Sequence, residues 1–240
     1  MDELCLRRME ALMTLRATVA SCFLLILPSV SYAQAAPAEE GPGAAGPMNA
    51  DSSDMVQPMA GDHWTYEVRD EITGTLKNPS TETITDVTAT EISMRTEIVG
   101  GGAPAYFVYD YLWNMKSSPA WKYAPNDGTG VKPSLKVGNA WTAQNTALFG
   151  GRSATERRSI SSKVVGEETI TTAAGTFQTF KIETQVTATN INDPTKKSKG
   201  MITSWYAPSI DHWAKRTMKF EANGHVAQNI SVALVDCGRR

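Results

Sequence analysis

The tripeptide Asp-His-Trp occurs twice in this chain, at residues 62–64 and 211–213, and holds two of its three histidines. Histidine and aspartate are common zinc ligands, and a catalytic zinc keeps three protein ligands and one open position. Adjacent residues of a strand point to opposite faces, however, so Asp62 and His63 cannot bind the same ion. We therefore expect the aspartate to close a turn, the tryptophan to enter the core, and both His63 and His212 to face solvent. The sequence predicts no metal site.

Other catalytic patterns are absent from the sequence. It has no Gly-x-Ser-x-Gly nucleophile elbow and no glycine-rich phosphate loop that leads into a helix. Glu167 and Glu168 follow Val165-Gly166, which is typical of a turn, so they indicate solvated carboxylates rather than an acid/base pair. A formal charge of −2 and a pI near 6.0 argue against nucleic-acid binding. We expect a protein that is not an enzyme and carries no cofactor.

Aromatic residues are the remaining chemical signal, because six Trp and seven Tyr suit both core packing and ligand clefts. The segment AYFVYDYLW at 105–113 is apolar on both faces, so as one strand it is covered on both sides or lines a cavity. Its residues 107, 109, 111 and 113 would share one face. Core packing is the more common fate of such residues. The ligand-binding candidates are Tyr66, Phe107, Tyr109, Tyr111, Trp113 and Trp205.

The elements that position these residues alternate between apolar and polar side chains. The alternation is clear in 177–187, 214–221 and 226–234, and it indicates half-buried antiparallel strands. No stretch after residue 33 shows a convincing helical stripe. The sequence therefore predicts an all-β fold: a single strongly curved antiparallel sheet, as a half-barrel or open barrel. A faint repeat between 61–65 and 138–142 adds the expectation of two meander copies.

Two turns can be predicted in detail. For the last hairpin we expect a three-residue loop, Ala222-Asn223-Gly224, which pairs Phe220 with Val226. For the segment before 177–187 we expect Gly175 in a conformation with positive φ. The turn should then shift the alternation at its end and fold Phe177 into the core.

The first 33 residues have the layout of a secretory signal peptide. Arginines precede the short apolar run at 17–30, and small residues follow it, so cleavage fits after Ala33 or Ala35. Met9 and Met13 are alternative start sites. Residues 34–59 are rich in Ala, Gly and Pro and predict a disordered tether. The folded domain is then expected at 60–237.

Cysteine usage fits export without a lipid anchor. The apolar run continues after Cys22, whereas a lipidated cysteine should follow it, so we do not expect lipidation. Removal of the signal peptide leaves Cys237 alone, near a C-terminus expected to be frayed, so no intramolecular disulfide can form.

Several motifs together resemble a family of uncharacterised bacterial periplasmic proteins. They are Gly61-Asp62-His63-Trp64-Thr65-Tyr66, Leu135 to Trp141, the segment from Val164 to Ile182 with its Ala174-Gly175-Thr176-Phe177 turn, and Trp205 to Pro208. Ala173 stands where that family usually has proline. The family is similar to the half-barrel of lipoprotein carriers, so the resemblance implies a curved antiparallel sheet with an apolar concave side. It implies no catalytic residues.

These observations lead to one expected function and two alternatives. We expect a periplasmic or secreted protein that binds an apolar or lipid-like ligand, or an envelope partner, on the concave side of its sheet. It should have no transmembrane span once the signal peptide is removed. A structural or interaction module of the cell envelope without a small ligand is the first alternative. A metal-dependent hydrolase is the second.

Overall fold

The computed structural model describes residues 57–150 and 154–239. The expected signal peptide, and the expected tether up to residue 56, lie outside the described residues. The described part belongs to one compact unit, Ala45–Arg240.

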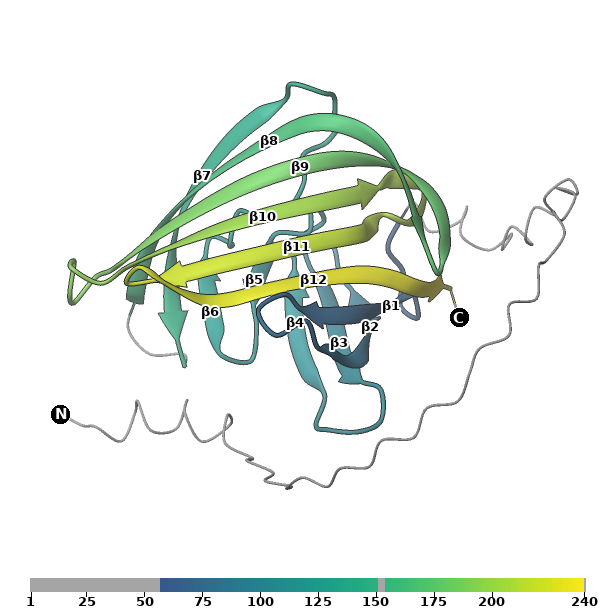
Figure 1. Ribbon diagram of the computed structural model, residues 1–240, viewed down its shortest axis with the longest axis horizontal. Coiled ribbons are helices and arrows are strands. Elements are labelled where there is room, and N and C mark those ends of the chain that lie inside the picture. Colours follow the sequence, from purple (N-terminus) through teal and green to yellow (C-terminus); the bar gives the residue numbers. More distant parts are fainter. Residues whose placement is uncertain (1–56, 151–153, 240) are drawn as a thin grey trace, which may run out of the picture. The chain divides into compact units, whose positions relative to one another are not determined.

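Twelve antiparallel strands make up this part of the chain (Figure 1). They are β1 (His63–Asp70), β2 (Leu76–Val87), β3 (Ile92–Ile98), β4 (Ala105–Tyr109), β5 (Met115–Ser117), β6 (Trp121–Ala124), β7 (Ala140–Phe149), β8 (Ala154–Thr172), β9 (Gly175–Asn190), β10 (Lys197–Ala207), β11 (His212–Ala222) and β12 (His225–Gly238). A single turn of 3₁₀ helix, Pro208–Ile210, joins β10 to β11. No helix in the described part is long and apolar enough to cross a membrane.

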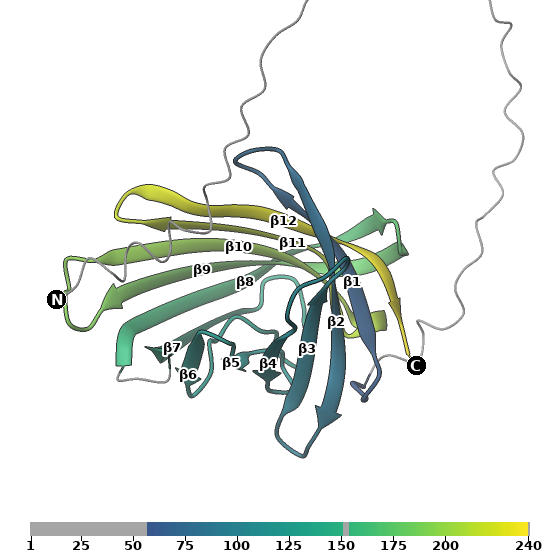
Figure 2. The same ribbon diagram turned by 90° about the horizontal axis from the view of Figure 1, so that it is seen from below.

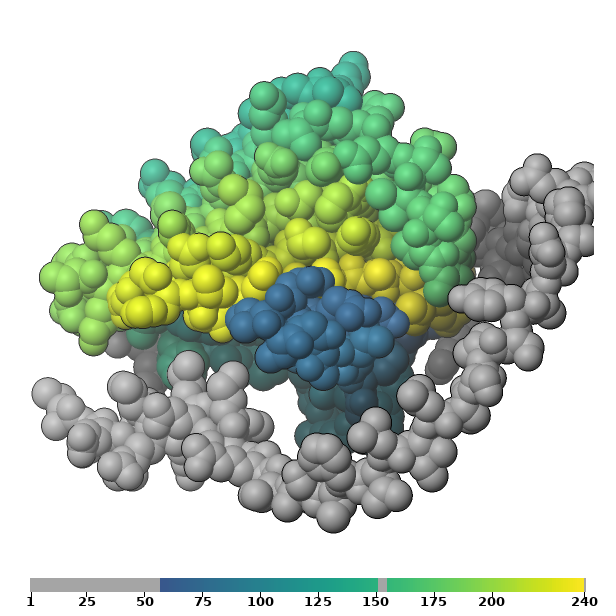
Figure 3. Space-filling view, in the orientation of Figure 1, coloured from purple at the N-terminus to yellow at the C-terminus, as the bar shows by residue number. Residues whose placement is uncertain are grey.

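The sheet closes into a barrel. Each strand pairs with its neighbours in sequence, and β1 pairs with β12 to complete the ring. Figure 3 shows this seam as the blue surface of β1 lying against the yellow of β12. The predicted all-β antiparallel fold is confirmed, and the sheet goes beyond a half-barrel by joining its two edges.

The strands differ greatly in length around the ring. The hairpin of β8 and β9 has strands of 19 and 16 residues, whereas β4, β5 and β6 have five, three and four. Figure 2 shows the long strands β8–β12 as a broad arched wall and β4–β6 as short segments. The two Gly-x-x-Trp segments of the faint repeat run into the first residues of β1 and β7, so each stands at the start of a run of six strands.

Because consecutive strands are antiparallel, the connections between them alternate between the two ends of the barrel. We call the end where β1 begins and β12 finishes the packed end. The opposite end, where β8 and β10 begin, is the mouth. The large core cluster lies toward the packed end and includes Trp64, Met94, Trp113, Ile210 and Leu234. A smaller cluster of Ile160, Val186 and Ile202 lies toward the mouth.

A polar layer separates these two clusters along β8 and β9. Ile160 and Val164 point inward on β8, and Ser162 stands between them on the same face. The Ser162 hydroxyl lies 2.8 Å from that of its cross-strand partner Thr184, so both buried groups are hydrogen-bonded. The interior is therefore layered rather than uniformly apolar.

The last hairpin differs from the predicted one. Ala222 pairs with His225, which leaves a two-residue turn of Asn223 and Gly224, both with positive φ. The turn is thus of the kind that favours Asn-Gly in tight hairpins. A bulge next to Phe220 then corrects the register, so Phe220 pairs with Gln228 rather than Val226. The prediction of a three-residue loop was wrong, because the extra residue that shifts the register lies in the strand beside Phe220 and not in the turn.

The prediction for Gly175 is confirmed, since its φ is +136°. Phe177 is buried as predicted. The alternation changes later than expected, however, between Thr179 and Ile182, opposite a bulge at Val165 in β8. Val165 and Gly166 are therefore a bulge within a long strand, not the turn that was predicted. Cys237 is likewise not frayed, because it lies in β12 opposite Trp64.

Candidate ligand-binding site in the barrel mouth

The mouth of the barrel contains a cavity of about 320 Å³. Its wall comes from β6 and β8–β12 and combines aromatic, aliphatic and charged side chains, among them Trp121, Tyr123, Glu156, Arg158, Val186 and Phe220. Val186 also belongs to the small apolar cluster, which therefore forms part of the cavity wall. Small-molecule sites are typically about 300–1,000 Å³ and mainly apolar, with a few polar groups. The mouth cavity fits the lower end of that range.

Phe220 and Gly200 shape one wall of the cavity. They are register partners on β11 and β10, and a Cβ atom at Gly200 would lie only 2.4 Å from a ring atom of Phe220. Glycine is thus required for the ring to lie against β10. On the other side, the rings of Trp121 and Phe149 meet edge to face at 5.1 Å. Aromatic rings therefore face the cavity from β6 and β11.

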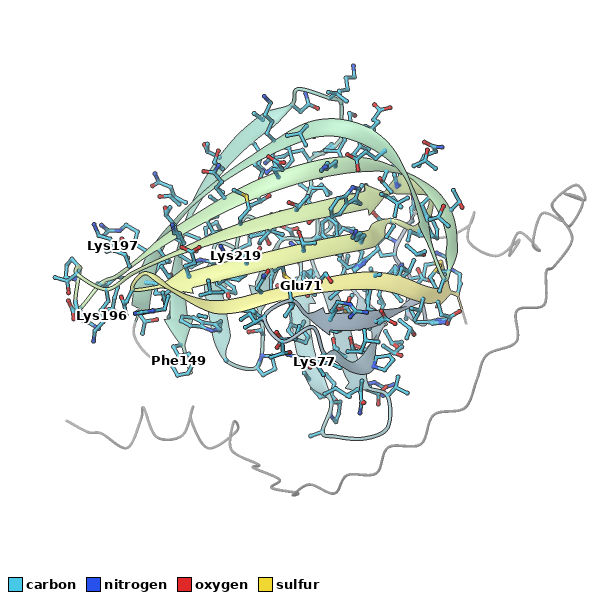
Figure 4. The ribbon with its side chains drawn as sticks, viewed as in Figure 1. Glu71, Lys77, Phe149, Lys196, Lys197 and Lys219 are labelled. Atoms are coloured by element: carbon cyan, nitrogen blue, oxygen red, sulfur yellow. The ribbon has the colours of Figure 1, made fainter. Side chains whose placement is uncertain are left out.

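Apolar side chains also gather on the exposed rim of the mouth. Phe149 at the end of β7 and Ile191 in the β9–β10 loop are exposed, as is Val226 at the start of β12. In Figure 4 Phe149 lies at the same end of the barrel as Lys196 and Lys197 on the β9–β10 hairpin. The opening is therefore bordered by apolar and cationic groups.

A second cavity, of about 340 Å³, adjoins the first between the hairpin ends of β9–β12. The two share Ala188, Ser198 and Lys199. The second one is lined by small, polar and charged residues, chiefly threonine and lysine, and by no aromatic ring. The mouth cavity is the better candidate because aromatic rings and a buried arginine line the same wall.

Arg158 is the most buried charged group of the mouth cavity, with 9% of its surface exposed. Its guanidinium carbon lies 5.0 Å from the centre of the Tyr123 ring, in cation–π geometry. Its Nη1 atom has no hydrogen-bond partner among the described residues. Glu156 precedes it on the same face of β8, and burial raises the pKa of that carboxyl while Arg158 opposes the shift.

A separate polar network lies inside the packed end, around His212. Its ring stacks on Trp64 with centroids 4.3 Å apart, and its Nδ1 lies 2.6 Å from the Tyr66 hydroxyl. Tyr66 donates its only proton to the carbonyl of Trp213, so the His212 Nδ1–H must be the donor to Tyr66. Burial lowers the pKa of His212 well below its usual value, so the ring is neutral.

The predicted solvent-facing position of the two histidines was wrong for His212, which is 3% exposed. The 3₁₀ turn before β11, with Asp211 in the left-handed region, changes the direction of the strand start. His63 is closer to the prediction, since its Nε2 lies 3.4 Å from the exposed Asp236 carboxylate. Asp62 behaves as expected, because its buried carboxylate accepts hydrogen bonds from the Met59 amide and from Arg239.

Glu82 and Arg216 bring charge into the same network. The Glu82 carboxylate lies 3.8 Å from His212 Nε2, and burial raises the pKa of Glu82 to about 7, with Arg216 opposing the shift. Arg216 stacks over Trp213 at 4.6 Å, and burial lowers its pKa against the attraction of Asp127 and Glu82. The inner polar groups therefore interact with one another rather than with an open cavity.

The structure does not bring the six candidate residues to the mouth cavity. Tyr66, Phe107, Tyr109 and Trp113 pack in or against the large core cluster at the packed end. Trp205 is buried elsewhere, where its Nε1 donates to Glu168 at 2.6 Å. Their role as ligand-binding residues stays a prediction.

Tyr111 does not share a face with its neighbours as predicted. Strand β4 ends at Tyr109, and the Asp110 carboxylate accepts the amides of Leu112 and Asn114 in a tight turn. Tyr111 is consequently exposed, and its hydroxyl donates to the Thr88 carbonyl. Trp113, with φ of 61°, turns back into the core. Asp110 was the available signal, because aspartate often caps such turns.

The mouth residues were missed for a different reason. Arg158 lies on the same face of β8 as Ile160 and Val164, which places it inside the barrel. An arginine in an alternating strand is ordinarily assigned to the solvent-facing side, so the sequence pattern did not indicate that Arg158 points into the barrel. Among the described residues no group of three or more His, Cys, Asp and Glu side chains could hold a metal ion.

One family model matches a part of the chain. Residues 145–227, about a third of the sequence, match the DUF3108-like family. The match contains the Val164–Ile182 segment and the Trp205–Pro208 motif, but it does not reach 61–66 or 135–141. No curated protein matches the chain in sequence.

Solved structures to which the chain is similar include three bacterial proteins. A candidate exported protein with a YmcC-like fold from Bacteroides fragilis is 14% identical with a TM-score of 0.48, over 76% of this chain and 98% of that one. A candidate lipoprotein from Parabacteroides distasonis is 13% identical with a TM-score of 0.47 and the same coverage of 76% and 98%. The hypothetical lipoprotein YmcC from Escherichia coli is 11% identical with a TM-score of 0.43, over 75% and 90%. These values identify no ligand or activity.

Proposed function

We propose that the protein is a non-catalytic, exported binding protein that holds a small amphipathic molecule in the mouth of its barrel. The observation that carries this proposal is the mouth cavity of about 320 Å³, whose aromatic and aliphatic wall also holds a buried arginine. Export is proposed from the signal-peptide layout of residues 1–33.

The layering of the interior supports binding at the mouth rather than deeper in the barrel. Trp64, Trp113 and Ile210 fill the packed end and are each at most 2% exposed. Trp121 and Tyr123 at the mouth are only half-buried, although burial of their rings would be favourable. A bound apolar chain would cover these rings without any change in the packed end.

The test uses the neutral fluorescent probe N-phenyl-1-naphthylamine. Ala188 lines the mouth cavity, so Ala188→Phe should fill it and weaken probe binding by about tenfold. Gln185→Phe is the matched control, because Gln185 is exposed on the opposite face of the same strand. The control should bind as the unchanged protein does. Absence of probe binding to the unchanged protein would reject the proposal and favour an interaction module without a small ligand.

A further inference from the structure

The mouth cavity contains one cation whose environment lacks a matching anion. Arg158 is 9% exposed, yet its Nη1 has no hydrogen-bond partner and it makes no ion pair with any residue that the structure describes. A buried charge without a partner is costly, because burial removes its hydration and nothing replaces it. Tyr123 offsets a part of that cost through its ring and through a side-chain hydrogen bond with the guanidinium, but the donors of Nη1 stay unused.

The surroundings of Arg158 do not supply the missing acceptor. Its cross-strand partner Asn145 is 5% exposed and leaves its own Oδ1 without a partner. Glu156 is the nearest acidic neighbour along β8, but burial raises the pKa of that carboxyl and so disfavours its charged form. The Asp127 carboxylate is engaged by the Met115 and Thr129 amides and by the Thr129 hydroxyl.

We infer that the ligand of the mouth cavity carries an anionic oxygen head group, a carboxylate or a phosphate, which pairs with Arg158 while its apolar chain lies along Trp121, Val186 and Phe220. The inference rests on the proposed function and specifies the chemical class of its ligand. Arginine suits this role because its planar donors match the oxygens of carboxylates and phosphates. The short aliphatic and aromatic wall fits a medium-length chain.

The experiment compares four ten-carbon amphiphiles: decanoate, decyl phosphate, decanol and decyltrimethylammonium. Each amphiphile is titrated into the complex of the protein with N-phenyl-1-naphthylamine, and its affinity is obtained from the loss of probe fluorescence as the probe is displaced. The anionic pair should bind about ten to a hundred times more tightly than decanol, as expected for a charge-assisted hydrogen bond in a shielded site. A preference between decanoate and decyl phosphate identifies which head group the site selects.

Neighbouring residues of β8 provide matched variants. Arg158→Gln should abolish the preference for the anionic amphiphiles, whereas Arg157→Gln, on the exposed face one residue earlier, should retain it. Arg158→Lys keeps the charge and should retain part of the preference if Arg158→Gln fails to fold. Glu156→Gln should tighten decanoate binding, because it removes a competing carboxyl group.

The outcomes separate the two proposals. If decanol binds as tightly as decanoate, or if Arg158→Gln keeps the preference, the head-group inference is wrong while the binding function stands. Tightest binding of decyltrimethylammonium would also overturn it, in favour of recognition by Glu156. If neither the neutral probe nor any of the four amphiphiles binds, the proposed function itself fails.

Discussion

The packed end and the mouth are built from the same strands, but they bury their polar groups differently. At the packed end Tyr66 and His212 bond to each other, and Trp64 covers the imidazole. At the mouth Arg158 is also largely buried, with 9% of its surface exposed, and its Nη1 contacts no acceptor among the residues that the structure describes. The Tyr66–His212 pair is satisfied within the protein, whereas the unpaired donor of Arg158 lines a cavity in which a ligand could meet it.

The largest expected contrast between the ends is in stability. Trp64→Ala should cost about 3–5 kcal/mol of unfolding free energy, because it opens a cavity in the fully buried cluster. Trp121→Ala at the mouth should cost about 1 kcal/mol, since its ring is only half-buried and a water-accessible cavity already lies beside it. Urea unfolding measures both. Equal midpoints for the two variants would remove the distinction between a packed end and an open mouth.

The next contrast is in pH dependence, and it concerns Glu82. Its pKa in the folded protein is about 7 against an ordinary 4.5, so folding favours the protonated form. This contribution is complete below pH 4.5 and is lost as the pH rises from 4.5 to 7, a loss of about 3 kcal/mol. Glu82→Gln lacks the titration, so its stability relative to the unchanged protein should rise over that interval.

Two other groups also change the stability of the protein in this pH range. The quantity to measure is therefore the difference in unfolding free energy between Glu82→Gln and the unchanged protein, in which their contributions cancel. Asp211, with a pKa raised to about 6 chiefly by burial, acts in the same direction as Glu82. The depressed pKa of His212 acts in the opposite direction, since stability falls as the pH drops below its usual value of 6.5. A pH-independent difference between Glu82→Gln and the unchanged protein would show that Glu82 is not shielded.

A smaller effect tests the internal hydrogen bonds of the packed end. Tyr66→Phe should cost about 2 kcal/mol, because it leaves His212 Nδ1–H and the Trp213 carbonyl without their shared partner. Tyr106→Phe is the control on the exposed face of β4 and should leave thermal unfolding unchanged. If both variants melt at the same temperature, the network contributes nothing to stability.

The smallest effect is expected on the rim. Ile191→Ser changes an exposed side chain of the β9–β10 loop, so the unfolding free energy should change by less than about 0.5 kcal/mol. Chemical unfolding beside Ile202→Ser, which disrupts the small apolar cluster, provides the comparison. A comparably large loss for Ile191→Ser would mean that the rim is part of the core.

Sequence alternation predicted the strands well because it reports which face of each strand is buried. Segments 177–187, 214–221 and 226–234 all lie within observed strands. Barrel closure could not be read in this way, since it depends on pairing between the first and last strands of the domain. The bulges that shift the register near Phe220 and Val165 were equally invisible, because one extra residue changes the face of all that follow.

The site was harder to predict than the fold. Pattern reasoning assigns charged residues to the solvent face, and the interior of this barrel contains Glu82, Arg158 and Arg216. The large aromatic residues were equally hard to place from the sequence, since Trp113 and Tyr66 pack in the large core cluster and do not line the mouth cavity. The signal that could have identified Arg158 is its spacing from Ile160 and Val164, which places all three side chains on the same face of β8. That face is known to be the inner one only when the sheet is known to close.

The seam between β1 and β12 also governs the order in which the barrel can form. Trp64 needs its partner Cys237, and the buried Asp62 needs Arg239, so the first strand stays an open edge until the last one is available. Pairings this distant in sequence make folding slow, because a long loop must close before any contact rewards it. For the export proposed above, such a delay would be useful, because the polypeptide would stay an open chain during translocation and close into a ring only when its C-terminal residues arrive.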